Sequence, residues 1–253
     1  MELNKIYNEN CLETLSRMPD GFVDLVVTSP PYNMRTRIRN GKYTTREKSE
    51  HFSKKYKFFS DDLPIDEFYQ VHKTILEELL RVSKLVCYNF QIVTGSKEAF
   101  FKIIGDFNIY IKDIIVWDKG HGQPSMHNQV LNSCYELILI LENDKKCGRL
   151  IQNAKFERGK MDNILRIGRG KKVHNTHGAV FPEKLAETLI EAFSNPNELV
   201  YDPFMGSGTT AIACIKINRN YIGSEISQEY CTIAEKRIQD ALVEKASKPQ
   251  QLF

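Results

Sequence analysis

Apolar runs and turn residues along the chain predict strands and helices that mostly alternate. Short apolar, β-branched runs bounded by proline, glycine or asparagine are typical of buried strands. The predicted strands are residues 3–7, 23–29, 85–91, 109–117, 135–141, 199–201 and 220–225. Helical spacing and capping residues predict helices over 11–18, 65–82, 96–104, 181–193, 209–216 and 227–246, with Ser96 and Ser227 as caps. Seven strands separated by helices or loops indicate one doubly wound α/β domain over residues 1–253.

Two long segments show no apolar period. Residues 33–62 directly follow a Pro-Pro turn, and residues 142–177 are polar and basic. Long segments without secondary structure in compact domains are usually lids or binding loops. We therefore expect a basic loop at 33–62 and an inserted recognition region at 142–177.

The charge of the chain is concentrated in these segments. The formal net charge is +3, but residues 35–60 carry +7, residues 158–172 carry +5 and the remainder carries −9. Positive charge confined to two loop-like segments of an otherwise acidic protein indicates a polyanionic partner. Solvated surface loops are the alternative explanation for both segments.

Composition narrows the class of protein further. Apolar residues make up 42% of the chain, which is near the average of globular proteins. The chain contains no run of 18 apolar residues, the length that a membrane-spanning helix needs. The amino terminus lacks the apolar core of a signal peptide, so we expect a cytoplasmic protein without a membrane partner. The six cysteines form no CxxC pair and the histidines lack ligand spacing, which argues against disulfides and against a metal site.

A rigid turn follows the predicted strand 23–29. Its sequence is Ser29-Pro30-Pro31-Tyr32, and the two prolines end the strand because they cannot donate a backbone hydrogen bond. Ligands of open α/β sheets bind outside the carboxyl ends of strands, which is where this turn would lie. An ordinary strand-ending turn would explain the prolines equally well, so the functional interpretation needs a second motif.

The second motif is glycine-rich. Residues 202–210, Asp-Pro-Phe-Met-Gly-Ser-Gly-Thr-Thr, follow a short strand and open a helix, so that a ligand could approach the backbone closely. The absence of Gly-Lys-Ser/Thr excludes a Walker-type phosphate loop. Glu225 ends the next predicted strand, 19 residues after Gly206, where an acid can hold ribose hydroxyls. The combination predicts a site for an adenosine-type cofactor.

The two motifs together resemble the DNA amino-methyltransferases, which methylate the exocyclic amine of cytosine or adenine. The order of the motifs, with the Pro-Pro turn first, resembles the β class of that family, and the similarity runs from about residue 4 to residue 240 with gaps at 33–60 and 142–173. The segment 177–182, His-Gly-Ala-Val-Phe-Pro, also resembles the family's segment before its glycine turn. The resemblance implies a circularly permuted, Rossmann-like sheet of seven strands and S-adenosylmethionine as the cofactor.

The resemblance assigns cofactor contacts to particular residues. Asp202 would face the ammonium of the methionine part, Glu225 the ribose and Ile226 one face of the adenine. Asn10 departs from the aspartate that the family usually has there. Phe181 and Phe204 are as compatible with core packing as with cofactor contact. The candidate cofactor residues are Asn10, Cys11, Phe181, Asp202, Phe204, Gly206, Gly208, Thr209, Thr210, Glu225 and Ile226.

Catalysis would occur at the Pro-Pro turn. A base amine inside a duplex is out of reach, so the target nucleotide must flip out, and Tyr32 is suited to stack on it. The Ser29 hydroxyl and the Pro30 carbonyl can accept hydrogen bonds from the amine, and Pro31 completes the rigid turn. The basic segments would neutralise phosphates of double-stranded DNA. The candidate DNA contacts are Arg35, Arg37, Arg39, Lys42, Lys54, Lys55, Arg166, Arg169, Lys171 and Lys172.

Several alternatives remain open in the sequence. With Ser29 in place of aspartate, the turn motif resembles that of the enzymes that methylate N4 of cytosine. N6 of adenine is the alternative target. RNA or a protein glutamine could accept the methyl group on the same fold, and an inactive nucleic-acid-binding module is a further alternative. A cognate restriction endonuclease is a possible partner, and a monomer and a homodimer are equally compatible with the sequence.

Overall fold

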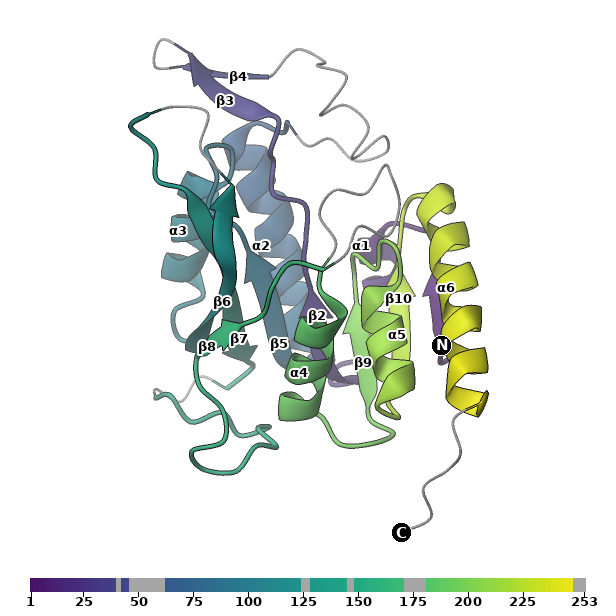
Figure 1. The fold of residues 1–253 in the computed structure, drawn as a ribbon. Helices are drawn as coiled ribbons and strands as arrows, with labels where there is room; N and C mark the ends of the chain where they lie inside the picture. Colours follow the sequence, from purple (N-terminus) through teal and green to yellow (C-terminus); the bar gives the residue numbers. More distant parts are fainter. Residues whose placement is uncertain (40–41, 46–61, 124–127, 145–147, 171–180, 248–253) are drawn as a thin grey trace.

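A mixed sheet of eight strands forms the centre of the structure, a computed structural model that describes residues 1–39, 42–45, 62–123, 128–144, 148–170 and 181–247 (Figure 1). The strand order is β1-β10-β9-β2-β5-β7-β6-β8. The strands are β1 (Lys5–Tyr7), β2 (Val23–Thr28), β5 (Ser83–Phe90), β6 (Ile111–Gln123), β7 (Ser133–Glu142), β8 (Ile164–Arg166), β9 (Leu199–Asp202) and β10 (Asn220–Ser224).

The sheet changes direction at one side. Strands β1, β10, β9, β2 and β5 are parallel, β7 is antiparallel to both β5 and β6, and β8 is parallel to β6. From β9 the chain continues to β10 on one side, whereas from β2 it continues to β5 on the other side. The strand order therefore reverses between β9 and β2, which is the position where open α/β sheets bind ligands.

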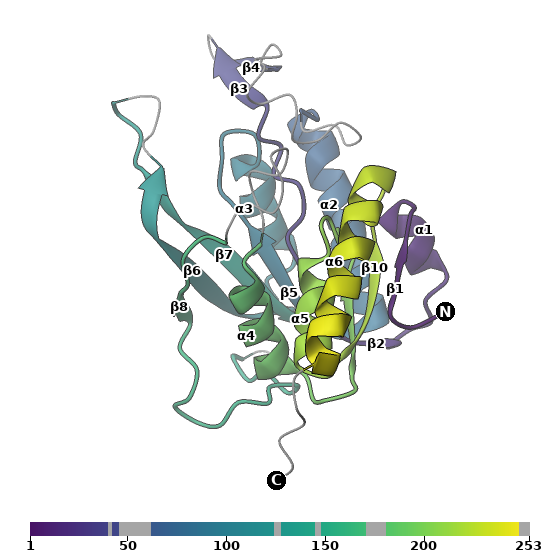
Figure 2. The same cartoon turned by 45° about the vertical axis from the view of Figure 1, so that its right-hand side comes forward.

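Helices cover both faces of the sheet (Figures 1 and 2). One face packs against α1 (Cys11–Ser16), α2 (Ile65–Val82) and α3 (Lys97–Asp106), and the other against α4 (Glu183–Phe193), α5 (Thr209–Lys216) and α6 (Gln228–Ser247). In β2, Val26 belongs to the first apolar cluster, whereas Leu25 and Val27 belong to the second. Both faces of β2 are therefore buried, which explains why its sequence is apolar without alternation.

The predicted elements are present, and most of their bounds differ by one or two residues. The predictions for α2 and α5 match residue for residue, because helical spacing and clear boundaries mark both. Ser227 caps α6 as predicted, since its hydroxyl accepts a hydrogen bond from the amide of Tyr230 at 3.3 Å. Ser96 occupies the N-cap position of α3 as predicted, but its hydroxyl bonds to the loop residues Gln91 and Val93 and makes no side-chain cap bond to the helix.

The sequence predicted a loop without secondary structure over residues 33–62, but the structure shows secondary structure in part of this segment. It contains an antiparallel hairpin of β3 (Thr36–Arg39) and β4 (Lys42–Thr45). Threonine, isoleucine and tyrosine favour strands, but the interspersed charges hide the period in the sequence. Residues 40–41 and 46–61 of the predicted loop lie outside the described residues.

The far side of the sheet is also larger than predicted. Strand β6 continues beyond Trp117 to Gln123 because it pairs with β7 as far as Ser133. Strand β8 brings the sheet to eight strands instead of seven. Its three residues are too few to show a period, and only pairing with β6 makes them a strand.

The described part of the segment 142–177 is tied to the sheet by buried polar groups. The Glu142 carboxylate, in a residue that is 2% exposed, accepts hydrogen bonds from the amides of Gln152 and Asn153 at 3.1 and 2.9 Å. The Trp117 indole donates to the carbonyl of Ile167 at 2.7 Å. These bonds hold both ends of residues 148–170 against the edge of the sheet, while residues 145–147 and 171–177 lie outside the described residues.

Neither a membrane-spanning helix nor a disulfide is found in the described part of the chain. None of its helices is both long and apolar enough to cross a bilayer. The cysteines at positions 11, 87, 134, 214 and 231 are free.

Gly95 lets the segment after the Pro-Pro turn approach the loop after β5. A side chain at Gly95 would overlap the backbone carbonyl of Asn33. The side-chain amide of Asn33 in turn donates hydrogen bonds to the carbonyls of Leu63 and Gly95, both at 2.9 Å. We expect Gly95→Ala to lower the free energy of unfolding by about 1–3 kcal/mol, because backbone atoms cannot move aside cheaply. Urea unfolding measures the change.

Gly105 is the matched control for this substitution. A side chain there meets no atom within 4 Å, and the residue lies inside α3. Gly105→Ala is expected to raise the free energy of unfolding by up to about 1 kcal/mol, because alanine favours a helix. Equal effects of the two substitutions would contradict the steric role of Gly95.

Candidate active site

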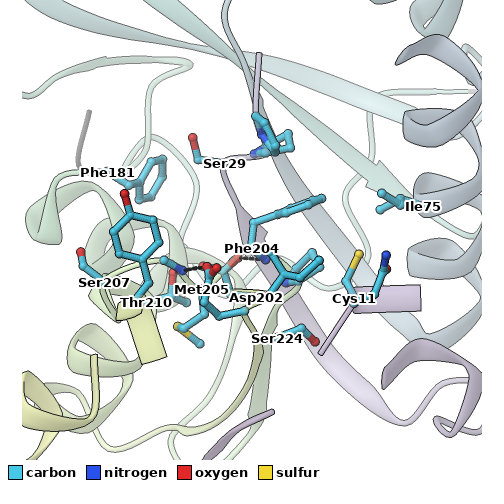
Figure 3. Close-up of a pocket in the computed structure, with 18 of the residues that line it drawn as sticks. Cys11, Ser29, Ile75, Phe181, Asp202, Phe204, Met205, Ser207, Thr210 and Ser224 are labelled. Carbon is cyan, nitrogen blue, oxygen red and sulfur yellow. Dashed lines mark hydrogen bonds between the residues drawn. The ribbon is translucent and has the colours of Figure 1, made fainter. Parts of the chain in front are cut away.

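A cavity of about 330 Å³ lies at the carboxyl ends of β2, β9 and β10. This volume is in the range of small-molecule sites. Figure 3 shows residues of the two turns and of the start of α1 around one hollow. The cavity is therefore at the reversal of strand order, as the two motifs predicted.

The structure brings the predicted residues together around this cavity. All four residues of the Pro-Pro turn line it, as do ten of the candidate cofactor residues. These ten are Asn10, Cys11, Phe181, Asp202, Phe204, Gly206, Thr209, Thr210, Glu225 and Ile226. Gly208 is not among the lining residues.

Gly208 has a packing role instead. Its φ of +84° is in the left-handed region, and a side chain there would lie 3.0 Å from the Cβ of Ala234 in α6. Glycine at this position therefore lets the start of α5 pack closely against α6. Gly206, with a φ of +54°, does line the cavity, so the two glycines serve different purposes.

Asp202 connects three elements at the floor of the cavity. Its carboxylate accepts hydrogen bonds from the Thr28 hydroxyl of β2 at 2.8 Å, from the Thr210 hydroxyl of α5 at 2.6 Å and from the amide of Phe204 at 3.0 Å. Burial raises the pKa of Asp202, although these hydrogen bonds oppose the shift. The residue is thus a buried carboxylate that a cation in the cavity would stabilise.

Glu225 joins the glycine turn to the start of α6. Its two carboxylate oxygens accept hydrogen bonds from the amides of Gly206 and Ser227, both at 2.8 Å. Burial raises the pKa of Glu225 against the effect of these bonds. A carboxylate oxygen can accept a second hydrogen bond, so Glu225 is able to hold hydroxyl groups in the cavity. Ile226, which is 46% exposed, forms the rim beside it.

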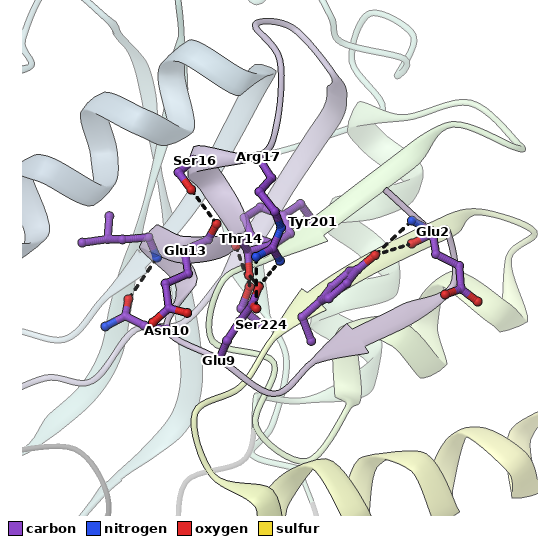
Figure 4. A network of polar contacts seen from close by, with 11 residues as sticks. Glu2, Glu9, Asn10, Glu13, Thr14, Ser16, Arg17, Tyr201 and Ser224 are labelled. Carbon is purple, nitrogen blue, oxygen red and sulfur yellow. Dashed lines mark hydrogen bonds and ion pairs between the residues drawn. The ribbon is translucent and has the colours of Figure 1, made fainter.

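The wall of the cavity near α1 is fixed by polar contacts (Figure 4). The Asn10 side chain accepts a hydrogen bond from the amide of Leu12 at 3.0 Å, so it caps α1 while its residue lines the cavity. A chain of side-chain contacts links β9 and β10 to α1 and runs through Tyr201, Ser224, Thr14, Glu9 and Arg17. Asparagine at position 10 therefore has a structural role that the sequence had not revealed.

Cys11 is a poor nucleophile in this position. It lines the cavity, but burial raises the pKa of its thiol to about 12. The thiolate is the reactive form of cysteine and is scarce at neutral pH with such a pKa. The site therefore suits a reaction that needs no cysteine nucleophile.

The Pro-Pro turn holds its serine and tyrosine together. The hydroxyl groups of Ser29 and Tyr32 are 2.6 Å apart, and the Tyr32 ring is 7% exposed with its centroid 6.0 Å from that of Phe90. The aromatic ring thus packs on the core and also lines the cavity.

His72 of α2 contacts the Pro-Pro turn from the core side, a role that the sequence did not reveal. Its Nδ1 atom is 2.5 Å from the Tyr88 hydroxyl, and its ring also hydrogen-bonds the backbone of Pro31, which can only be the carbonyl because proline has no N–H. Burial lowers the pKa of His72 to about 3. A histidine on an apolar helix stripe gives no signal that its ring reaches the Pro-Pro turn.

Further polar residues behind the turn were also missed. The Asn89 amide group donates to the Tyr32 hydroxyl at 2.6 Å and to Glu136 at 2.7 Å, and Lys119 pairs with Glu136 at 3.1 Å. The Asn89 carbonyl oxygen is buried with no hydrogen-bond partner among the described residues. These three residues come from β5, β6 and β7, so their proximity depends on strand pairing that a sequence pattern does not reveal.

The candidate DNA contacts are described only in part. Arg35 is partly buried, whereas Arg166 and Arg169 are exposed. Arg166 lies 4.0 Å from Asp118. The backbones of Arg37, Arg39 and Lys42 belong to the β3–β4 hairpin. Residues Lys54, Lys55, Lys171 and Lys172 lie outside the described residues.

The fold and the two turns define an α/β methyltransferase of permuted chain order. The family model described as DNA methylase, N6_N4_Mtase, matches residues 23–236. The chain therefore belongs to this family and is a DNA methyltransferase that acts on N4 of cytosine or N6 of adenine.

Individual relatives agree with this family. The Type II methyltransferase M.HinfI of Haemophilus influenzae is 29% identical over 259 residues, which span 94% of this chain and 69% of the relative. Among solved structures, the PvuII DNA methyltransferase (cytosine-N4-specific) superposes with a TM-score of 0.68 at 17% identity, covering 95% of this chain and 91% of the other. The M1.HpyAVI–SAM complex superposes with a TM-score of 0.59 at 24% identity, covering 92% and 98%. These structural likenesses establish the shared fold.

The buried histidine makes stability depend on pH. Because the pKa of His72 is about 3 when folded and 6.5 ordinarily, the unfolded chain binds its proton more tightly. The free energy of unfolding is therefore highest above pH 6.5, where the ring is neutral in both states. It decreases as the pH falls from 6.5 towards 3, because only the unfolded chain takes up the proton in this range. We expect a loss of about 5 kcal/mol across this window, from the size of the shift. In His72→Gln this contribution should vanish, and equal acid sensitivity of both proteins in urea unfolding would contradict it.

Proposed function

We propose that the protein transfers a methyl group from S-adenosylmethionine to N4 of cytosine in a specific sequence of double-stranded DNA. The observation that carries this proposal is the single cavity shared by the Ser29-Pro30-Pro31-Tyr32 turn and the glycine turn. A cofactor at the glycine turn would lie beside a base held at the Pro-Pro turn. S-adenosylmethionine would supply an activated methyl group on a sulfonium ion.

The residues of the cavity fit this cofactor. Asp202 is a buried and Glu225 a partly buried carboxylate, both with raised pKa values, so a cationic ligand with a ribose would stabilise the charges of both. Asp202 would face the ammonium group and Glu225 the ribose hydroxyls. The exposed Ile226 would cover the adenine, and the backbone at Gly206 leaves room for the methionine part.

Phe181 and Phe204 have different surroundings in the cavity. The Phe181 ring packs edge-on against Trp117 with a centroid distance of 6.0 Å, and Phe204 packs against the apolar cluster around α1 and α2. Both rings also line the cavity, so each can combine core packing with contact to a ligand. We propose Phe204 as a cofactor contact because it belongs to the glycine turn itself.

The Pro-Pro turn would activate the amine by accepting its hydrogen bonds. The Ser29 hydroxyl and the Pro30 carbonyl are hydrogen-bond acceptors on this turn, and the hydrogen bond between His72 and Pro31 helps to fix its position. Bonds from the amine to these oxygens draw the nitrogen lone pair out of conjugation and towards the methyl group. Alignment of this kind contributes several kcal/mol without a strong base.

Cytosine is the proposed target because position 29 is a neutral hydroxyl. The cytosine-N4-specific PvuII enzyme shares the fold but, at 17% identity, gives no evidence about the base in this chain. Adenine N6 is the alternative target, since a hydroxyl and a carbonyl could hold either amine.

DNA would approach from the side where the cavity opens. The β3–β4 hairpin and the tip of the β6–β7 pair project on this side of the sheet (Figure 1). The hairpin carries Arg37, Arg39 and Lys42, and Arg35 precedes it. Basic residues at these positions would neutralise phosphates while the target base flips into the cavity. Residues 148–170, with the exposed Arg166 and Arg169, are the proposed recognition segment.

The product identifies both the reaction and the base. The protein is incubated with S-adenosylmethionine and genomic DNA that lacks methylation, and the digested nucleosides are identified by mass spectrometry. We expect N4-methylcytosine, and a Ser29→Ala variant should form it at least about tenfold more slowly because one acceptor is lost. N6-methyladenine would contradict the choice of base, and the absence of any methylated nucleoside would contradict the reaction.

Cofactor binding should depend on pH through the carboxylates of Asp202 and Glu225. A cation prefers the ionised forms, so its binding lowers the pKa values of Asp202 and Glu225 and releases protons. Affinity for S-adenosylmethionine should therefore rise with pH above the ordinary carboxyl values of 3.8 and 4.5 and level off beyond the raised pKa values. Calorimetry in two buffers of different ionisation enthalpy measures the released protons. Proton uptake, or an affinity independent of pH, would contradict these contacts.

A further inference from the structure

A buried polar chain leads from the catalytic turn to an ion pair. The Ser29 and Tyr32 hydroxyls are 2.6 Å apart, and the Tyr32 hydroxyl is 3.2 Å from the Oε2 atom of Glu136. The Oε1 atom of the same carboxylate pairs with Lys119 at 3.1 Å. The side chains of Lys119 and Glu136 are only 3% and 10% exposed. The chain thus connects the rim of the cavity to a charge pair between β6 and β7.

This ion pair has no evident role in forming the fold. Removing two charges from water costs free energy that their attraction only partly offsets, so apolar residues would serve packing at least as well. Glu136 occupies a position on β7 where the same face continues with the core residues Ile138 and Ile140. A charged residue on this otherwise apolar face of β7 therefore needs a local explanation.

Hydrogen-bond donors and acceptors define the direction of the chain. An ionised carboxylate can only accept, so the Tyr32 hydroxyl donates its single proton to Glu136. Asn89 donates to Tyr32 at 2.6 Å and to Glu136 at 2.7 Å, with a longer contact to the Ser29 hydroxyl at 3.3 Å, which fixes the orientation of its amide. Because the Tyr32 proton goes to Glu136, the Tyr32 oxygen accepts in the contact with Ser29, and Ser29 therefore donates to Tyr32.

The opposite direction is electrostatically unfavourable. If Tyr32 donated to Ser29, its oxygen and the Glu136 oxygen would face each other at 3.2 Å with no proton between them. The Ser29 proton would then be free to point into the cavity, where it would meet the amine as a donor facing a donor. The carboxylate prevents this arrangement because it requires the tyrosine proton.

We propose that Glu136, paired with Lys119, is a positioning residue that orients the hydroxyl chain so that Ser29 presents a lone pair, rather than its proton, to the amine of the target base. This inference rests on the proposed function, in which Ser29 accepts a hydrogen bond from that amine. Glu136 acts through Tyr32 and does not itself touch the substrate. Tyrosine at position 32 thereby serves as a relay between Ser29 and the ion pair as well as an aromatic surface.

A double-mutant cycle tests the relay through Tyr32. Glu136→Gln can present an amide donor to Tyr32, so we expect it to lower kcat at least about tenfold while KM for S-adenosylmethionine stays unchanged. In a Tyr32→Phe background the relay is already absent, and Glu136→Gln should then change kcat less than about twofold. An equal loss in both backgrounds, or none in either, would overturn the proposal.

A glutamate at the other end of the same strand provides the control. Glu142 is also buried, but it binds the amides of Gln152 and Asn153 away from the cavity. Glu142→Gln should reduce stability while leaving kcat of the folded protein unchanged. A similar loss of kcat in this variant would indicate a general effect of neutralising a buried glutamate in β7.

Neutron diffraction from crystals of the deuterated protein tests the direction of the chain without any turnover. We expect one deuteron on Ser29 pointing to Tyr32 and one between Tyr32 and Glu136. A deuteron on Tyr32 pointing to Ser29 would overturn the inference even in an active enzyme. Absence of methyl transfer by the unaltered protein would instead overturn the proposed function, and the deuteron positions would still decide whether Glu136 orients the chain.

Discussion

The parallel pairing of β9 with β2 is the contact on which the site depends. Leu25 is in register with Val200, and Val26 with Tyr201, although the chain between them contains most of the protein. Because both strands run in the same direction, the Pro-Pro turn and the glycine turn emerge at the same edge of the sheet. The hydrogen bond from Thr28 to Asp202 then joins the two turns directly. A small cavity with two chemically different walls is the consequence.

The polar groups around this cavity are held in place by hydrogen bonds within the protein. Asp202 and Glu225 are held by hydroxyl and amide donors of the surrounding elements, yet burial still raises the pKa of each. A cation would stabilise the ionised forms of both carboxylates, so the site favours a positively charged ligand over a neutral one. On the opposite wall, His72 and the ion pair of Glu136 with Lys119 fix the Pro-Pro turn. Preorganisation of both walls suits a reaction that depends on alignment.

The permuted order of the chain has little effect on this geometry. The strand order, with its reversal between β9 and β2 and its antiparallel β6–β7 pair, places both turns at one edge of the sheet. Two segments are attached to this sheet. The β3–β4 hairpin follows the Pro-Pro turn, and residues 148–170 are held to β6 through Trp117 and to β7 through Glu142. Both attachments carry basic residues, whereas the turns that line the cavity follow strands of the sheet.

The sequence by itself determined the elements with strong local signals and the two motifs. Helical spacing fixed α2 and α5 to the residue, and proline and glycine marked the turns at Ser29 and Gly206. Because turn chemistry depends on neighbouring residues, these features were predictable from the sequence. Tertiary structure alone decided the hairpin β3–β4, the three-residue strand β8 and the packing role of Gly208. It also decided the grouping of His72, Asn89, Lys119 and Glu136 behind the Pro-Pro turn, because strand register and helix packing place residues together that no local pattern connects.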